Sequence, residues 1–307
     1  MTQQHAISQP KLSIMVPAYG ESPYLEETLK SLIENSTTEI SQIFVFDDAS
    51  TTSHILDTCN KFGQDIQYNR NKTNIGLAGN FQNCINQSTT KYTMIIGSDD
   101  RVLPGFEETF LRAVGEWPET SILQLGVRAI DENGNVINGL TERIKAIISP
   151  VRKMDKNTSG AHLIKRLLIG QWLYFPAIVW RTETLKRYPL NLEYRTAVDL
   201  NLILEMALKN EIFTLCSRPV FEYRRHKESV SSQLGRSAAR TKEELLVHED
   251  FLEKAHDEGL SKFDFLARLA LTIRLHAVKS GILLLIKDPR TAMELIRISM
   301  KPVRIRS

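Results

Sequence analysis

Two pairs of adjacent aspartates are the residues best suited to chemistry in this sequence. Asp99-Asp100 follows the apolar run 92–96, and Asp47-Asp48 follows the apolar run 43–46. Adjacent carboxylates beside a buried strand are costly to remove from water unless a positive charge lies nearby. Hard cations such as Mg²⁺ or Mn²⁺ take carboxylate oxygens and share their shell with substrate phosphates. Asp99-Asp100 therefore indicates a metal site, although the pair alone is more typical of an acidic turn or a cap before a helix around 106–114.

Asp47-Asp48 also has two interpretations. A carboxylate directly after a strand can accept hydrogen bonds from the base or ribose of a nucleotide, as it does in dinucleotide-binding folds. The alternative is an acidic loop that leads into a helix capped by Ser50 or Thr51. Neither GxGxxG nor GxxxxGK[ST] occurs in the chain, so a bound diphosphate would depend on a metal for much of its neutralisation.

Short apolar runs that alternate with helical patterns predict the elements that position these carboxylates. Strands are expected at 12–16, 43–46, 66–68 and 92–96, with helices that begin at Ser22-Pro23, near Ile55 and at Leu77. Strands that are apolar on both faces and separated by helices indicate a parallel sheet covered on both sides. The ligand crevice of such a sheet lies beyond the carboxyl ends of its strands. Segments 17–20, 47–50 and 97–100 should therefore converge on one edge.

The rest of the chain continues the α/β pattern and then becomes helical. Strands are expected at 121–127, 175–180 and 212–216, a hairpin turn at 131–135, and a helix capped by Thr196. From about Ser237 onward the pattern is wholly helical and mildly basic. The three cysteines are scattered without metal-ligand spacing and are interpreted as core residues of a reducing compartment.

Composition excludes some classes of function. The chain has 307 residues with 42% hydrophobic and 24% charged residues, an ordinary globular balance, and a formal net charge of +3. So small a charge argues against nucleic acid as a partner. The polar N-terminus predicts no secretory signal, and the apolar run 282–286 is far too short to span a bilayer. The expected location is the cytoplasm, at the inner face of the membrane if the C-terminal helices bind lipid.

Four short segments, taken in order, resemble family 2 glycosyltransferases of the GT-A fold. They are 16–19 (VPAY), 46–51 (FDDAST), 74–76 (NIG) and 98–100 (SDD), the last with Pro104. Segment 221–231 also resembles the part of that family that closes the catalytic domain. The likeness covers roughly 12–231. It implies a Rossmann-like, mostly parallel mixed sheet with flanking helices in a catalytic domain at 1–235, and a helical region at 236–307. The donor half of that domain would be about 11–115 and the acceptor half about 116–235.

The resemblance assigns roles at matching positions. Asp100 would hold Mn²⁺ or Mg²⁺, Asp48 would bind the base, and Asp47 would support its turn. Segment 223–226 (YRRH) could reach the leaving diphosphate, with His226 as a second metal ligand or as a donor to phosphate. The alternative for this segment is a solvated basic strand edge. The expected donor is a nucleoside-diphosphate sugar, in particular a UDP-sugar. The remaining donor-site positions are Pro17, Ala18, Tyr19, Glu21, Asn74, Gly76, Ser98 and Asp99. Gly97 departs from the family, which often has a further acid there.

The resemblance also implies inverting transfer with Asp199 as the general base, acting on a glycan or lipid-linked acceptor. Many relatives have Glu-Asp where this chain has Val198-Asp199. The alternative role of Asp199 is a first-turn acid that complements the helix dipole, worth ~0.5 kcal/mol. Trp172 could stack on an acceptor sugar, but core packing is the more usual role of a single tryptophan.

An apolar stripe in the C-terminal helices has two interpretations. The stripe comprises Phe265, Leu266, Leu269, Ile273 and Ala277, with basic residues beside it and at the tail. It predicts packing on the catalytic domain, with peripheral membrane contact as an addition. Two further functions stay open for the whole chain, a nucleotidyltransferase and a non-catalytic protein that binds sugar nucleotides. A nucleotidyltransferase would need a basic glycine-rich loop after the first strand, which segment 18–21 does not supply. A non-catalytic protein stays open because Gly97 stands where the family often has an acid and because Asp199 has no acidic neighbour.

Overall fold

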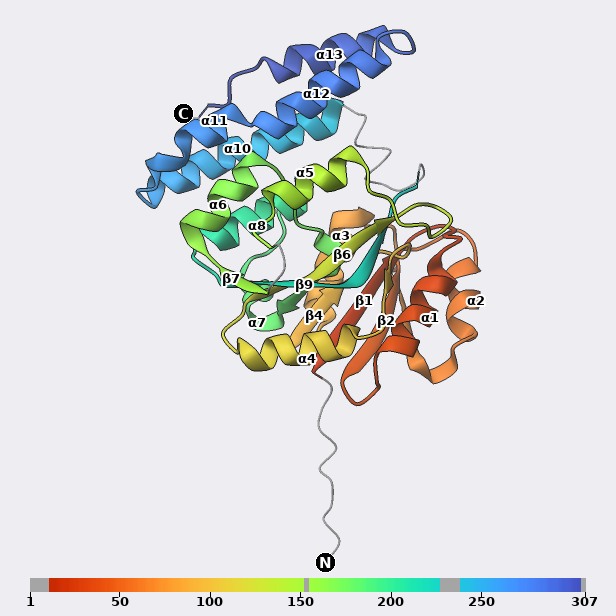
Figure 1. The fold of residues 1–307 in the computed structure, drawn as a ribbon. Coiled ribbons are helices and arrows are strands. Elements are labelled where there is room, and N and C mark those ends of the chain that lie inside the picture. Colours follow the sequence, from red (N-terminus) through yellow and green to blue (C-terminus); the bar gives the residue numbers. More distant parts are fainter. Residues whose placement is uncertain (1–10, 152–154, 227–237, 305–307) are drawn as a thin grey trace, which may run out of the picture.

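The computed structural model describes residues 11–151, 155–226 and 238–304. A nine-stranded mixed sheet forms the centre, in the order β3-β2-β1-β4-β8-β6-β9-β5, with β7 paired to β9 (Figure 1). The strands are β1 (Leu12–Ala18), β2 (Ser41–Asp47), β3 (Ile66–Arg70), β4 (Tyr92–Ile95), β5 (Arg101–Val102), β6 (Ile122–Ile130), β7 (Lys156–Thr158), β8 (Ile178–Arg181) and β9 (Phe213–Arg224).

Helices cover both faces of the sheet. The helices of the α/β part are α1 (Leu25–Asn35), α2 (His54–Asn60), α3 (Gly76–Gln87), α4 (Phe106–Glu116), α5 (Leu140–Ile148), α6 (Gly160–Ile169), α7 (Thr182–Arg187) and α8 (Val198–Leu208). Residues of α1, α2 and α4 join one hydrophobic cluster, and residues of α3, α6, α7 and α8 join the other. The predicted arrangement of strands covered on both faces is therefore confirmed.

The C-terminal helices extend the second of these clusters. They are α10 (Ala238–Asp257), α11 (Asp264–Leu269), α12 (Leu271–Leu284) and α13 (Pro289–Ser299), stacked above α6 and α8 in Figure 1. Phe251 of α10, Ile273 of α12 and Leu295 of α13 belong to the same continuous core as Leu167 of α6. Among the described residues, no helix is long and apolar enough to cross a membrane.

The first four long strands have the predicted parallel register. β1 pairs in parallel with β2 and β4, and β2 pairs in parallel with β3. Ala18 lies opposite Asp47, so the ends of β1 and β2 coincide. Beyond β4 the sheet becomes mixed, because β8 runs antiparallel to both β4 and β6. The polar residues after β1, β2 and β4 consequently share one edge, as the sequence predicted.

Three helices begin later in the chain than the predicted caps Ser22, Ser50 or Thr51, and Thr196 imply. Helix α1 begins at Leu25, while Ser22 Oγ donates to Ser98 O. Helix α8 begins at Val198, while Thr196 Oγ1 donates to Glu243 Oε2 of α10 at 2.6 Å. Ser50 donates to Asp47, and α2 begins only at His54.

Other boundaries differ less. Residues Phe175–Ala177 form a 3₁₀ turn before the four-residue strand β8, since Pro176 has no N–H to give to the sheet. Strand β9 runs far beyond the predicted 212–216, to Arg224. The turn at 131–135 is confirmed by the bond from Asp131 N to Asn135 O. The cysteines are buried and free, and burial raises the pKa of Cys59 to about 11.

The predicted C-terminal stripe is corrected by the structure. Ile273 and Ala277 are buried in the helical core, whereas Phe265 is 73% exposed and Leu269 37% exposed. The C-terminal helices therefore have two apolar sides. One is packed in the core with α10 and α13, and the other faces outward.

A matched pair of glycines tests how closely β6 and β9 approach. A Cβ on Gly126 would lie 2.1 Å from Arg218 O and 3.0 Å from Pro219 N, and neither backbone atom can turn aside. We expect Gly126→Ala to lower the free energy of unfolding by about 2–3 kcal/mol, measured by urea denaturation. Gly115→Ala, in α4 with open space around it, should instead raise it by up to about 1 kcal/mol. An unchanged urea midpoint for Gly126→Ala would contradict the close approach.

Candidate functional site

Asp47 is buried at the end of β2 and is fully engaged within the protein. Its Oδ1 accepts from Ser50 N at 2.8 Å and Ser50 Oγ at 2.5 Å. Its Oδ2 accepts from Tyr68 OH and Arg70 Nη1, each at 2.7 Å. Burial opposes ionisation, but these hydrogen bonds and the Arg70 charge outweigh it and lower the pKa of Asp47. Asp47 therefore holds the turn after β2 and has no hydrogen-bonding capacity left for a ligand.

Asp48 organises the loop before α3. Its Oδ1 accepts from Asn71 Nδ2 and Ile75 N, and its Oδ2 accepts from Gly76 N at 2.9 Å. Gly76 has φ +75°, a conformation that disfavours any residue with a side chain. A carboxylate offers about four acceptor positions, so three bonds leave Asp48 one for a ligand.

Residues missed by the sequence analysis stabilise this loop. Asn80 is 2% exposed and donates to Phe46 O at 2.9 Å, while its Oδ1 accepts from Asn71. Asn83 in turn donates to Asn71 Oδ1. Asn71 precedes the NIG segment, and Asn80 and Asn83 follow it, at no recognisable motif spacing. Only their closeness in sequence to the loop that Asp48 holds could have indicated them.

The segment after β1 lies beside these loops. Pro17 and Ala18 end the buried strand, and Tyr19 extends from it with 59% of its surface exposed. Gly20 N donates to Ser50 Oγ at 2.9 Å, which ties this segment to the turn after β2. Glu21 is exposed. An exposed aromatic ring at the carboxyl edge of a parallel sheet is suited to stacking on a flat ligand group.

Asp99 and Asp100 end the loop after β4 and face one point. A Cβ on Gly97 would lie 2.6 Å from Asp99 Oδ1 and 3.0 Å from Asp100 Oδ2. The other oxygen of Asp99 contacts His226 Nε2 at 2.9 Å, and Asp100 Oδ1 accepts from Arg224 N at 2.9 Å. Burial, and then the Asp99 carboxylate, raise the pKa of Asp100 well above its usual range.

This donor set fits a hard cation that also binds phosphate. No group of three or more His, Cys, Asp or Glu among the described residues is arranged to enclose a metal ion. Mg²⁺ and Mn²⁺ need no such enclosure, because one or two carboxylates are enough when a substrate diphosphate supplies the other oxygens. The bare Cα of Gly97 leaves the space that the two carboxylate oxygens face.

Arg224 holds the aspartate loop in place from the end of β9. Its guanidinium is 2% exposed and donates to Asp99 O at 2.9 Å and to Glu27 Oε2 at 2.5 Å. Its carbon lies 4.4 Å from the centre of the Tyr24 ring, and that ring lies 5.0 Å from the His226 ring. The interpretation of segment 223–226 as a solvated basic strand edge is therefore wrong for Arg224, which is buried by its bonds to the aspartate loop and to α1.

Asp199 follows the donor loops by about 100 residues in the sequence and lies in the first turn of α8. Its Oδ2 accepts from Gln171 Nε2, and its Oδ1 accepts from Leu200 N, each at 2.8 Å. Burial raises the pKa of Asp199, while the charges of Arg240 and Lys145 oppose that rise. Trp172 is 4% exposed within the core, so its interpretation as a packing residue is confirmed.

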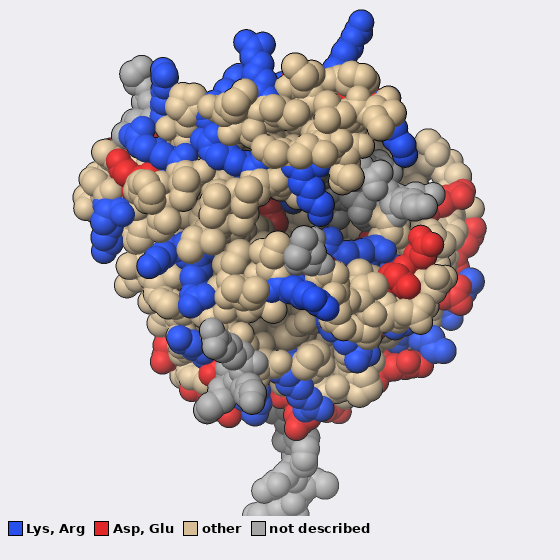
Figure 2. Space-filling view, turned by 45° about the horizontal axis from the view of Figure 1, so that its top comes forward, with Lys and Arg blue, Asp and Glu red and all other residues tan. Residues whose placement is uncertain are grey.

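The charge of Lys145 on α5 acts on this carboxylate. Its Nζ is 3.6 Å from the centre of the Tyr174 ring. Burial, together with Arg225 and Arg240, lowers the pKa of Lys145 to about 7. Arg225 Nε lies 2.7 Å from Glu142 Oε1 on the same helix, so the residue after Arg224 connects β9 to α5. Figure 2 shows a hollow below the C-terminal helices with Lys and Arg side chains at its border.

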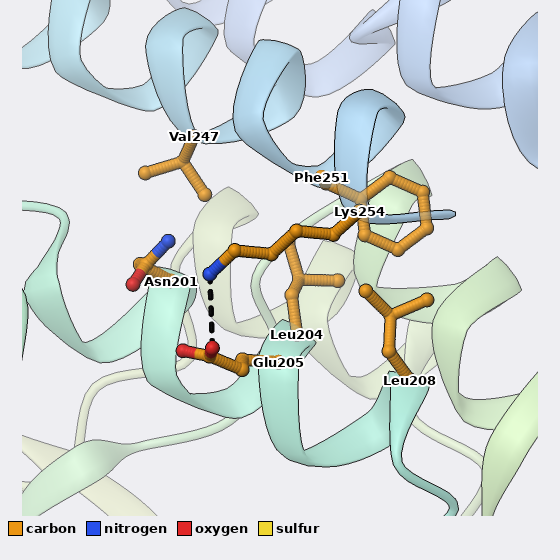
Figure 3. A pocket seen from close by; sticks show the side chains of 7 residues that line it. All are labelled: Asn201, Leu204, Glu205, Leu208, Val247, Phe251 and Lys254. Carbon is orange, nitrogen blue, oxygen red and sulfur yellow. Dashed lines mark hydrogen bonds and ion pairs between the residues drawn. The ribbon is translucent and has the colours of Figure 1, made fainter. Parts of the chain in front are cut away.

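A pocket between α8 and α10 is a packing seam. It is lined by Asn201, Leu204, Glu205, Leu208, Val247, Phe251 and Lys254. The Lys254 side chain lies across it and binds Glu205 Oε1 at 2.9 Å, over an apolar floor (Figure 3). This ion pair leaves the pocket without the convergent polar groups of a ligand site.

Comparison with known proteins yields one family. The model of "Glycosyl transferase family 2" matches residues 13–173. A Campylobacter jejuni GalNAc(5)-diNAcBac-PP-undecaprenol beta-1,3-glucosyltransferase is 30% identical over 110 residues, 35% of either chain. The abequosyltransferase RfbV of Salmonella typhimurium is 33% identical over 93 residues, 29% of this chain and 28% of that protein. The alignments span less than half the length of these curated relatives.

Solved structures match over nearly the whole chain. Staphylococcus aureus TarS 1-349 in complex with UDP-GlcNAc has a TM-score of 0.61 at 15% identity, covering 94% of this chain and 90% of that one. The mannosyltransferase PcManGT of Pyrobaculum calidifontis, in complex with GDP-Man and Mn²⁺, has a TM-score of 0.59 at 13% identity, covering 95% and 87%. At such identities the match establishes the fold, which is GT-A with C-terminal helices.

Two arginines of β9 test the role of Arg224. Arg224→Gln removes the buried donor to the Asp99 carbonyl and one of the two ion-pair partners of Glu27, which is 41% exposed, so we expect a loss of about 2–3 kcal/mol in the free energy of unfolding. Arg218→Gln removes only a surface ion pair with Glu108 at 3.1 Å and should cost at most about 1 kcal/mol. Urea denaturation of both variants measures the difference. Equal losses would show that Arg224 does not hold the aspartate loop.

Proposed function

Because the chain belongs to glycosyl transferase family 2, we propose that it transfers a sugar from a nucleoside-diphosphate donor to an acceptor hydroxyl. The observation that carries this proposal is the aspartate loop after β4. Asp99 Oδ1 and Asp100 Oδ2 approach one point beside Gly97, at the edge of the sheet where the loops after β1 and β2 also lie. A carboxylate pair on such an edge suits a cation-bound diphosphate.

The donor would lie across the carboxyl ends of β1, β2 and β4. Pro17, Ala18 and Tyr19 would contact the base, with Glu21 at the rim of the nucleotide pocket. Asp48 would accept a hydrogen bond from the base with the one carboxylate lone pair that its loop leaves unused. The loop with Asn74 and Gly76 would cover the ribose. Ser98 and Asp99 would contact the ribose or sugar. Because the fold matches solved complexes with UDP-GlcNAc and with GDP-Man, a UDP-sugar is the first donor to test.

Asp100 and His226 would hold Mn²⁺ or Mg²⁺ together with the donor diphosphate. The bound cation would supply positive charge to the diphosphate as it departs. His226 already contacts Asp99 at 2.9 Å, so its imidazole is within reach of the same group of oxygens. The match to a fold solved with Mn²⁺ supports this proposal.

Asp199 would act as the general base of an inverting transfer. It takes the proton from the acceptor hydroxyl, and the acceptor oxygen forms a bond to the anomeric carbon. The bond from that carbon to the diphosphate breaks on the opposite side, and the diphosphate leaves with the electron pair. Gln171 and Leu200 N hold the two carboxylate oxygens in a fixed orientation for this step. The acceptor that we propose is a glycan, free or lipid-linked, as in bacterial surface polysaccharide synthesis; the name of the Campylobacter relative supports it.

Ligand-induced stabilisation tests the donor site. We expect one nucleoside diphosphate, with Mn²⁺, to raise the melting temperature, since a ligand at 100 times its Kd adds about 2.7 kcal/mol. Asp100→Asn should fold and lose this metal-dependent gain. Asp65→Asn, an exposed aspartate far from the loop in sequence, should keep it. No shift with any nucleotide in the wild type would overturn the donor site and favour a non-catalytic protein.

The pH dependence of turnover tests Asp199. A general base works only when deprotonated, so kcat should fall as the pH drops through the raised pKa of Asp199. Gln171→Leu removes a hydrogen bond that favours the charged form, and we expect the acid limb to move to higher pH. Asp199→Asn should lose at least about 100-fold in kcat with nucleotide binding intact.

Gln64→Leu, an exposed change on the surface, is the control and should leave the pH profile unchanged. If Asp199→Asn kept full turnover, another residue would be the base. If Gln171→Leu left the acid limb in place, the hydrogen bond would not tune it.

A further inference from the structure

Most of the large aliphatic residues of helix α12 are exposed, and two of its three buried residues are small. Ala277 and Gly281 are buried, together with Ile273. Five exposed aliphatic residues, which we call the α12 stripe, recur every four and three positions along the opposite side. The stripe consists of Leu271, Leu275, Val278, Ile282 and Leu285, with exposures from 36% to 60%. Residues at this spacing lie on one side of a helix.

The packing of α13 forces this orientation. A Cβ on Gly281 would lie 3.0 Å from Ile296 Cγ1 and 3.1 Å from Ala292 O, so α13 occupies the side of α12 where no side chain fits. Figure 1 shows α12 and α13 as the outer layer of the helical region, on the far side of α10 from the sheet. Ile286, directly after the stripe, is 97% exposed. The stripe is therefore a fixed outward face, not a loosely packed core.

The segment of the chain that carries the stripe has an excess of positive charge. From Asp264 to Arg304 the chain carries eight Lys and Arg but only three Asp and Glu. The basic residues are Arg268, Arg274, Lys279, Lys287, Arg290, Arg297, Lys301 and Arg304. Helix α12 itself contains Arg274 and Lys279 and no acidic residue. The upper part of Figure 2 correspondingly shows many Lys and Arg and few Asp and Glu.

This charge pattern favours one of two possible binding partners of the stripe, a second copy of the chain or a lipid surface. A second copy packed on the same face would add its own Arg274 and Lys279 to the interface, with no acid on α12 to pair with any of these four cations. An anionic lipid surface supplies negative headgroups for the cations and an acyl boundary for the aliphatic side chains. We propose that the α12 stripe docks this protein on an anionic membrane surface. The proposal does not depend on the sugar-transfer activity.

Vesicle flotation with the full-length chain tests the proposal. The chain should float with vesicles of equal parts phosphatidylglycerol and phosphatidylcholine and much less with phosphatidylcholine alone. Raising the salt from about 0.1 M to 1 M shortens the Debye length from about 10 Å to 3 Å and should weaken binding. Equal binding to both vesicle types, or binding to neither, would overturn the proposal.

Surface variants separate the stripe from the rest of the molecule. Leu275→Gln with Ile282→Gln should lower the partition coefficient at least about tenfold, since two aliphatic side chains no longer leave water. Lys279→Glu should lower it on anionic vesicles while leaving the stripe intact. Leu56→Gln, at a 38% exposed leucine on α2, is the matched control and should bind like the wild type.

Circular dichroism melting confirms that each variant is folded, and sedimentation velocity gives the oligomeric state. A wild-type dimer that the double variant converts to monomer, without vesicle binding, would assign the stripe to a second copy instead. A double variant that floats as well as the wild type would also overturn the proposal.

Discussion

The buried guanidinium of Arg224 is the interaction on which the arrangement of the donor edge depends. A guanidinium removed from water is costly unless its donors are satisfied. Here they are satisfied by the carbonyl of Asp99 and the carboxylate of Glu27, while the Arg224 backbone N–H binds the Asp100 side chain. One residue of β9 thus fixes the loop after β4 and helix α1 at the same time. Neither element could shift without leaving a buried charge unpaired.

The same network continues into the sheet. Glu27 also pairs with Arg101 of β5, and Arg101 pairs with Glu222, which lies fully buried on β9. Glu222 accepts a second ion pair from Arg128 of β6 at 2.5 Å. Buried ion pairs contribute little net stability, but removing one partner costs much free energy because it leaves the other charge unpaired. These pairs therefore disfavour any packing of β5, β6 and β9 that would separate them. The short strand β5 is held in the sheet both by its backbone pairing with β9 and by the ion pairs of Arg101.

Much of the donor edge could be predicted from the sequence because it depends on local pattern. Apolar runs mark β1, β2 and β4, and the polar residues after them must meet where parallel strands end. The errors lie where distant side chains compete for a local role. Ser22 and Thr196 are residue types that favour helix caps. Their hydroxyls instead donate to Ser98 O and Glu243 Oε2, and the helices begin later, at Leu25 and Val198. Likewise, nothing in segment 224–226 (RRH) indicates that Arg224 is buried. Its side chain is covered by elements that are distant in sequence, namely β5, α1 and the turn after β6.

The positions of Arg224 and Arg225 give a physical reason for the two halves of the site to respond to each other. Arg224 holds the aspartate loop, and the next residue pairs with Glu142 of α5, one turn from Lys145, whose charge acts on Asp199. Arg224 contacts the aspartate loop directly, so its position depends on the charge of that loop. Arg225 is the next residue of the same backbone segment. Backbone N–H of Arg225 is bonded to Ile130 O at 2.8 Å, so this segment is held in the sheet and has little freedom to absorb a displacement. The loop after β4 and helix α5 are therefore held by two consecutive residues of one backbone segment, so a displacement of the loop would strain the Arg225–Glu142 pair.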